Sequence, residues 1–127
     1  MAKLLIVEDD ESVRMFVSRA LERAGHQIHV AADGAQGLDM ICAADSDYDL
    51  VVSDIRMPEM DGIEMAMCAA RACPGLRILL MTGYADQRER ADDLSSVIID
   101  VVNKPFSLAE IRSRVEAALC VELTRAA

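Results

Sequence analysis

Short aliphatic runs alternate with amphipathic stretches along the chain, and this alternation constrains the possible folds more than any other feature. The aliphatic runs predict strands, and those without polar interruption are typical of strands buried on both faces. They occupy residues 4–7, 28–31, 50–53, 77–81 and 97–102. Strands that alternate with helices predict an α/β fold, in which a parallel sheet carries helices on both faces.

The intervening stretches carry helix signals. From Ser12 to Ala24 apolar residues, Phe16 among them, recur at the helical period, and Gly25 then supplies a stop. Further signals are the capping boxes Asp33-x-x-Gln36 and Ser107-x-x-Glu110, and the Asp61-Gly62 pair before a helix to about Ala72. Residues 86–95 are polar and predict a further helix from a weaker pattern. For methionines 57, 60, 65 and 67, core filling fits better than an adaptable binding surface, at least for those on the inner helix face.

Composition narrows the class of protein. The 127 residues suit one domain, expected over 1–121 with a tail at 122–127 and no output domain. A net charge of −9 argues against nucleic acid and anionic membranes as partners. No long apolar run indicates a membrane span or signal peptide. The four cysteines form no Cys-x-x-Cys pair, which favours free thiols and a cytoplasmic location.

Polar residues follow several predicted strands at the point where each strand ends. Glu8 and Asp9 follow the first, Asp54 the third, Thr82 the fourth and Lys104 the fifth. In a parallel sheet these ends share one edge, where ligands bind. Three nearby carboxylates need either a raised pKa or a cation, and oxygen ligands suit Mg²⁺. Asp54 would then be a nucleophile toward phosphorus, with Lys104 and Thr82 contacting phosphoryl oxygens.

Each of these residues also has a plainer interpretation. Acids after strands are commonly solvated, and Asp10, Glu11 and Ser12 are expected to start the first helix. Thr82 alone would be a turn hydroxyl, and Lys104 alone a solvated charge. The plainer interpretations do not predict that all of these groups occur together at successive strand ends.

Four segments resemble the receiver domain of two-component response regulators: LLIVEDDESVR, DLVVSDIRMPEMDGIE, ILLMTGYA and VVNKPFS. The resemblance covers about residues 3–120 and implies a doubly wound (βα)5 fold of the flavodoxin-like or CheY-like kind, with strand order 2-1-3-4-5. It implies that Asp54 is the phosphoacceptor, Thr82 the switch hydroxyl and Lys104 the phosphoryl-binding residue. It assigns Mg²⁺, or another divalent cation, to Glu8, Asp9, Asp54 and the Arg56 carbonyl. Pro105 would follow a cis peptide.

The sequence departs from the family pattern at several positions. Glu8 stands where Asp is common, and its longer side chain should still reach the metal, directly or through water. Val101 occupies the position of an aromatic switch residue, so signalling would use the Thr82 loop, the fourth helix or Tyr84. Arg56 and Tyr84 flank the site, and their bulk suggests a phosphoryl group partly shielded from hydrolysis.

The resemblance also implies partners. A histidine kinase or histidine phosphotransfer protein would donate the phosphoryl group, and a protein target would bind the face formed by helix four, strand five and helix five. Among stand-alone receivers the chain is most similar to the CpdR type, which implies a role beside a ClpXP-type protease. A phosphorelay shuttle is the alternative within the family, and a receiver that binds partners without phosphate is disfavoured by the intact Asp54, Thr82 and Lys104.

A metal-dependent phosphohydrolase is a further alternative from another class. Such enzymes usually carry a general acid two residues after the nucleophilic Asp, and here that position is Arg56. No cap domain is visible either. The chain is therefore expected to be no enzyme beyond accepting a phosphoryl group and slowly losing it.

Overall fold

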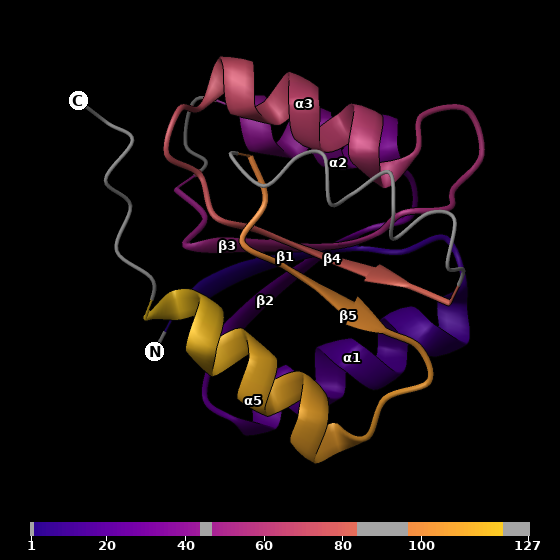
Figure 1. Cartoon of the computed structure of the whole chain (residues 1–127), viewed down its shortest axis with the longest axis vertical. Helices are drawn as coiled ribbons and strands as arrows, with labels where there is room; N and C mark the ends of the chain where they lie inside the picture. Colours follow the sequence, from indigo (N-terminus) through magenta and orange to yellow (C-terminus); the bar gives the residue numbers. More distant parts are fainter. Residues whose placement is uncertain (1, 44–46, 84–96, 121–127) are drawn as a thin grey trace.

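The computed structural model describes residues 2–43, 47–83 and 97–120, which form strands and helices in alternation (Figure 1). The predicted helix at 86–95 and Tyr84 lie outside these residues. The elements are β1 (Lys3–Val7), α1 (Glu11–Arg23), β2 (Gln27–Ala31), α2 (Gly34–Cys42), β3 (Leu50–Asp54), α3 (Gly62–Ala72), β4 (Ile78–Thr82), β5 (Asp100–Asn103) and α5 (Leu108–Leu119).

All five strands pair in parallel in one sheet of order β2-β1-β3-β4-β5, which confirms the predicted fold class and strand order. The order reverses between β1 and β3, so the ends of these two neighbouring strands form the topological switch point of the sheet. Asp54 is the last residue of β3, and the loop after β1 begins at Glu8. The fold therefore brings both segments to one edge.

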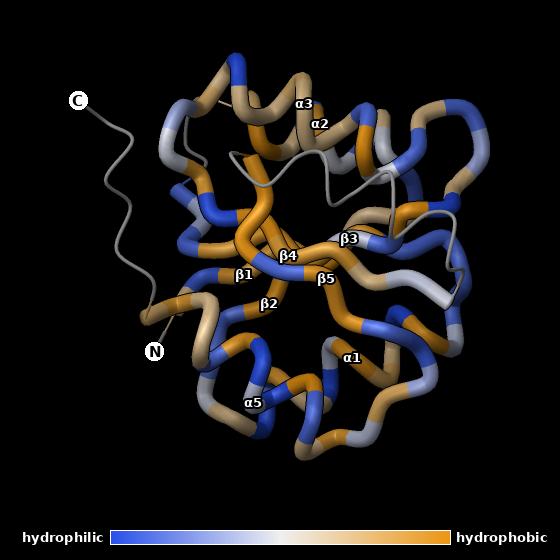
Figure 2. Tube along the Cα trace, viewed as in Figure 1, coloured by the Kyte–Doolittle hydropathy of each residue, from blue (hydrophilic) through white to orange (hydrophobic). Residues whose placement is uncertain are grey.

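Helices cover both faces of the sheet: α2 and α3 lie on one side, and α1 and α5 on the other (Figure 1). Successive strand residues point to opposite faces, so one strand serves two cores. Leu5 and Val7 pack toward α2 and α3, whereas Leu4 and Ile6 pack toward α1 and α5. Figure 2 shows the hydrophobic strands between two layers of helices in which hydrophobic and hydrophilic residues alternate.

Side-chain caps fix where the helices begin. Asp10, Asp33, Asp61 and Ser107 each accept a hydrogen bond from the backbone N–H three residues later. The expected start of the first helix is confirmed, with Asp10 as its cap. In the predicted Asp33 capping box, the Gln36 side chain accepts from the N–H of Ala32, one residue before the cap. These caps satisfy amide groups that helix geometry leaves without partners.

Two predictions about individual elements were wrong. β5 begins at Asp100 instead of Val97: Ile98 is buried and the Ile99 N–H bonds the Ile78 carbonyl, but the segment 97–99 is irregular. The apolar run thus reflects burial without regular strand structure. Phe16 is 41% exposed, although its helical spacing predicted a place in the buried stripe.

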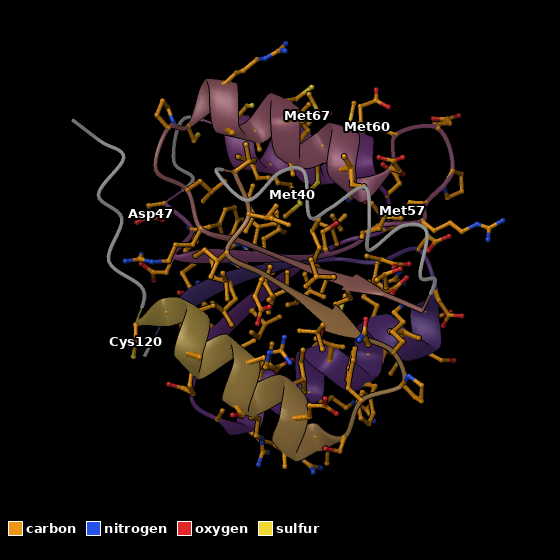
Figure 3. All side chains as sticks on the ribbon, viewed as in Figure 1. Met40, Asp47, Met57, Met60, Met67 and Cys120 are labelled. Carbon is orange, nitrogen blue, oxygen red and sulfur yellow. The ribbon has the colours of Figure 1, made fainter. Side chains whose placement is uncertain are left out.

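The methionines divide between core and surface. Met65 is fully buried and Met57 nearly so, which confirms core filling for these two, whereas Met67 is exposed on α3 (Figure 3). The Lys104-Pro105 peptide is cis, as the resemblance implied. Among the described residues, no helix has the length and apolar character needed to span a membrane.

Candidate phosphoacceptor site

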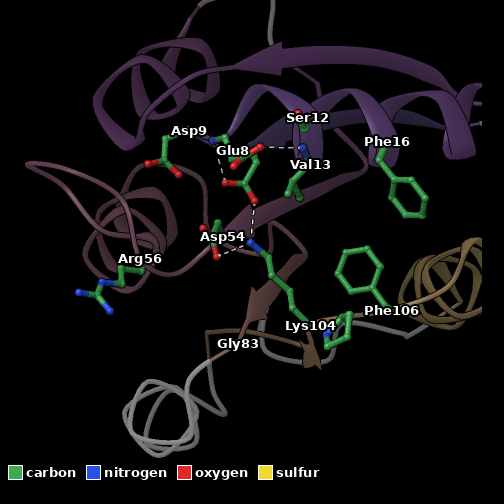
Figure 4. A pocket seen from close by; sticks show the side chains of 12 residues that line it. Glu8, Asp9, Ser12, Val13, Phe16, Asp54, Arg56, Gly83, Lys104 and Phe106 are labelled. Carbon is green, nitrogen blue, oxygen red and sulfur yellow. Dashed lines mark hydrogen bonds and ion pairs between the residues drawn. The ribbon is translucent and has the colours of Figure 1, made fainter.

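A groove of about 850 Å³ opens at the carboxyl ends of β1, β3 and β5 (Figure 4). One end of it is acidic, and the other is apolar, where the rings of Phe16 and Phe106 lie next to each other. The lining residues are Glu8, Asp9, Asp10, Ser12, Val13, Phe16, Asp54, Arg56, Gly83, Lys104, Pro105 and Phe106. The groove thus contains all but one of the predicted site residues among the described ranges.

Glu8 is fully buried and its main chain is held on both sides. Its N–H donates to the Ala31 carbonyl at 3.1 Å, which extends the pairing of β1 with β2. Its carbonyl accepts from the Arg14 guanidinium at 2.9 Å. Its carboxylate accepts from the Asp10 N–H at 3.1 Å through Oε2. This loop therefore presents Glu8 from a fixed backbone.

Lys104 connects the acidic loop to the end of β3. Its Nζ lies 2.8 Å from Glu8 Oε1 and 3.2 Å from Asp54 Oδ1. Its backbone N–H donates to the Thr82 carbonyl at 2.7 Å, so the ends of β4 and β5 are joined immediately before the lysine side chain enters the groove. Asp54 is 7% exposed, and it lines the groove.

Burial changes the protonation of this cluster. Desolvation, aided by the negative charge of Asp54, raises the pKa of Glu8 to about 7 against the opposing effect of Lys104. Burial also raises the pKa of Asp54, although Lys104 again opposes the shift. For Lys104, burial favours the neutral form, but the hydrogen bond to Glu8 and the charge of Asp54 outweigh it and the pKa is raised.

The carboxylates of Glu8, Asp9 and Asp54 fit a divalent cation. Each offers an oxygen, and these atoms lie within 4.8 Å of one another. Oxygen-only ligands suit Mg²⁺, which commonly uses one or two carboxylates with water and phosphate. A positive ion would also relieve the repulsion that favours protonation of the two buried acids. The expected convergence of the three carboxylates is confirmed.

The remaining predicted residues are placed differently. Thr82 ends β4 beside Lys104 but is 2% exposed, and it is not among the described residues that line the groove. Arg56 does line the groove, yet its side chain extends away from the carboxylates (Figure 4). The ligand role of its carbonyl and the shielding role of Arg56 and Tyr84 stay predictions. Val101 is buried in β5.

Sequence reasoning missed two features of the site. The first is Arg14, which bonds the Glu8 carbonyl; a long basic side chain early in a helix points back toward its N-terminus, and that direction was a usable signal. The second is the contact between Phe16 and Phe106, whose ring centroids are 6.3 Å apart. Nothing in the helical periodicity distinguishes an apolar residue on the groove from one in the core.

Comparison with known proteins agrees with this geometry. Residues 4–116 match the response regulator receiver domain family. The chain is 34% identical over 119 residues to the response regulator receiver protein CpdR of Brucella abortus, covering 94% of this chain and 98% of CpdR. It is 33% identical to part of the sensor kinase CckA of the same organism, covering 93% of this chain but 12% of the kinase.

Solved structures show the same fold. The chemotaxis protein CheY4 of Vibrio cholerae superposes with a TM-score of 0.82 at 28% identity, over 93% of this chain and 98% of CheY4. The fold, the acidic groove at its switch point and the match across 4–116 lead to one conclusion: this chain belongs to the response regulator receiver domain family of two-component signal transduction.

Proposed function

We propose that the protein is a phosphorylation switch in which Asp54 accepts a phosphoryl group from a phosphohistidine donor. The observation that carries this proposal is the position of Asp54: its carboxylate lies in an open groove, between two further carboxylates and the ammonium group of Lys104 at 3.2 Å. Asp54 ends β3 and Lys104 follows β5, so the nucleophile and the cation already lie side by side before the donor arrives.

In the transfer step, a carboxylate oxygen of Asp54 attacks phosphorus while the bond from phosphorus to the donor nitrogen breaks, and that electron pair stays on the donor imidazole. Lys104 is placed to stabilise negative charge on the phosphoryl oxygens. Glu8, Asp9, Asp54 and the Arg56 carbonyl would hold Mg²⁺, which when bound supplies charge compensation for those oxygens. Slow attack of water on the aspartyl phosphate would then release inorganic phosphate and restore the Asp54 carboxylate.

Phosphorylation would add nearly two negative charges beside Thr82, whose hydroxyl can donate to the new oxygens. A partner that contacts the Thr82 loop then meets a different surface in the two states, as a population shift requires. Similarity to CpdR along nearly its whole length supports a cytoplasmic regulator that acts by binding another protein. By this resemblance the partner would be a ClpXP-type protease or its adaptor. The target surface would include β5 and α5.

Phosphoryl uptake by Asp54 is tested directly with a small acyl phosphate. Wild type with Mg²⁺ should gain the mass of one phosphoryl group, whereas Asp54→Asn should gain none. Asp39→Asn is the matched control, because Asp39 is an exposed residue of α2 outside the groove, and it should behave as wild type. Equal uptake by Asp54→Asn, or no uptake by wild type, refutes the proposal.

Partner binding is a separate prediction. A target protein should bind the phosphorylated and the unphosphorylated protein with affinities that differ by about tenfold, a ratio within the usual range for coupling between two sites. Titration of the same target against wild type with and without the phosphodonor measures that difference, and Asp54→Asn should not respond to the donor. A target with equal affinity for both forms would rule out the switch.

A further inference from the structure

We infer that Glu8 is a positioning residue for Lys104: its carboxylate holds the ammonium group beside Asp54 before metal or phosphoryl group is present. The inference rests on the proposed function, because it gives one of the acidic residues of that site a second task. It concerns the residue at which this chain carries Glu in place of the common Asp.

The two carboxylate oxygens of Glu8 have separate partners. Oε2 accepts from the Asp10 N–H at 3.1 Å, which orients the side chain, and Oε1 faces Lys104 Nζ at 2.8 Å. The backbone on either side is tied to β2 through Ala31 and to α1 through Arg14. The side chain is 1% exposed, so water competes little for its oxygens. Glu8 is thus the fixed member of the ion pair.

Lys104 is the member that needs positioning. Its side chain is long and flexible, it is 25% exposed, and an unrestrained lysine would occupy many rotamers. The ammonium lies nearer to Glu8 than to Asp54, at 2.8 against 3.2 Å. Glu8 therefore determines where Lys104 stands, and Asp54 receives a cation that is already in place.

The length of Glu8 is essential to this arrangement. An Asp at this position would withdraw the carboxylate from Lys104 by about 1.5 Å, the length of one C–C bond. It could keep the bond to the Asp10 N–H, since short acidic side chains readily bond the amide two residues on. The shorter residue would thus retain the loop but loosen its hold on Lys104.

Lysine side-chain NMR on the metal-free protein tests the inference without any contribution from Mg²⁺. The chain has only two lysines, Lys3 and Lys104. Lys3 pairs with Asp47 at 2.7 Å, far from the groove, so its ammonium signal is an internal control for folding. The quantity measured is the rate at which each ammonium group exchanges hydrogen with water.

Two variants that remove one carboxylate from the same loop are compared. In Glu8→Gln, exchange at Lys104 should accelerate by about tenfold or more, as expected for loss of one charge-assisted hydrogen bond. Among the described residues, the Lys104 side chain forms ion pairs with Glu8 and Asp54 and not with Asp9. In Asp9→Asn, hydrogen exchange at Lys104 should therefore stay within about twofold of the wild-type rate. Glu8→Asp should fall between them, and the Lys3 signal should not change in any variant.

Unchanged Lys104 exchange in Glu8→Gln overturns the inference, as does an equal acceleration in Asp9→Asn. If Glu8→Gln alters the Lys3 signal and so fails to fold normally, Glu8→Asp replaces it in the comparison with Asp9→Asn. Lys104 exchange that is no faster in Glu8→Asp than in Asp9→Asn then overturns the inference. Wild-type uptake from the acyl phosphate is measured in parallel. Normal uptake together with unaltered Lys104 exchange refutes the positioning role alone, whereas absent uptake refutes the proposed function.

Discussion

At the scale of single residues, burial is the factor that makes the acidic groove chemically unusual. Glu8 is fully buried whereas Asp9, the next residue, is exposed. Desolvation raises the pKa of Glu8 from 4.5 to about 7 even though Lys104 lies within hydrogen-bond distance. At pH 7 the folded, metal-free protein therefore keeps a proton on Glu8 in about half of the molecules and a carboxylate facing Lys104 in the rest, whereas the unfolded chain has released this proton.

The sign of the resulting pH dependence follows from this difference. A carboxyl whose pKa is raised on folding contributes stability below its unfolded pKa, and that contribution is lost as pH rises through the folded pKa. Between pH 5 and pH 8 the free energy of unfolding of the metal-free protein should fall by up to about 3 kcal/mol. Denaturant titrations with a chelator present measure the loss.

Two controls define this prediction. Glu8→Gln should flatten the pH profile, because its amide does not titrate. Added Mg²⁺ should restore more stability at pH 8 than at pH 5, since the metal competes with the proton at Glu8. A metal-free protein that gains stability from pH 5 to pH 8 would contradict the assignment of the raised pKa.

Among single residues, the sequence was most informative about the polar side chains that directly follow predicted strands. Glu8, Asp9, Asp54 and Lys104 were recognisable because their side chains have no reason to follow buried strands in succession. The contacts among them were not predictable. Which oxygen of Glu8 faces Lys104 depends on the Asp10 amide and on the burial of the whole loop.

At the scale of elements, the start of α3 is fitted directly against the end of β3. The Gly62 N–H donates to the Ile55 carbonyl at 2.7 Å, and a Cβ at Gly62 would overlap the Asp54 carbonyl oxygen. Only a residue without a side chain lets the helix approach this closely. The position of the Asp54 backbone thus depends on a helix that contributes no side chain to the groove.

Gly62→Ala should therefore destabilise the protein by about 3 kcal/mol, the upper range for forced overpacking. It should also slow phosphoryl uptake, because relief of the overlap displaces Asp54. Gly75→Ala is the matched control: its φ of 90° makes Ala strained, but no atom lies within 4 Å of the added Cβ. That variant should lose about 1 kcal/mol and keep normal uptake.

Thermal unfolding and uptake by intact-mass measurement distinguish the two glycine variants. Equal loss of uptake in both would show that general instability, and not displacement of Asp54, explains the effect.

Element boundaries were predictable from capping residues at α1, α3 and α5. The start of β5 was not, because Ile98 is buried by packing alone and carries the same apolar signal as a strand residue.

At the scale of the whole molecule, the two phenylalanines are gathered at one place although they are 90 residues apart. Phe16 comes from α1 and Phe106 from the loop before α5, and both line the groove next to the acidic site. If Asp54 accepts a phosphoryl group as proposed, an apolar surface beside it suits a protein donor more than a small one, since a small acyl phosphate has no group to place there.

Phe16→Ala should slow phosphoryl transfer from a histidine-phosphorylated protein by about tenfold, in the range of interface truncations that cost more than 1 kcal/mol. Uptake from a small acyl phosphate should change much less. The stability should fall only slightly because the ring is 41% exposed. Met67→Ala, an equally exposed residue on α3, is the control for loss of apolar surface. Equal slowing with both donors would exclude a docking role.

The fold class was predictable because aliphatic runs typical of buried strands alternate with stretches of helical spacing, and both were clear along most of the chain. The strand order came from family resemblance alone, because hydrophobic periodicity does not state which strands are neighbours. The pairing of Phe16 with Phe106 depended on that order as well, since it places α1 beside α5.

The layering of the helices has a consequence for synthesis on the ribosome. The layer of α2 and α3 is built from consecutive helices. The other layer packs α1, the first helix, beside α5, the last described helix (Figure 1). Ile111, Val115 and Ala118 of α5 complete the core that Val17 and Leu21 of α1 begin. Until α5 has emerged, the nascent chain exposes the part of that apolar face which α5 covers, and aggregation can then compete with folding. Folding of this protein is thus completed only by its last described helix.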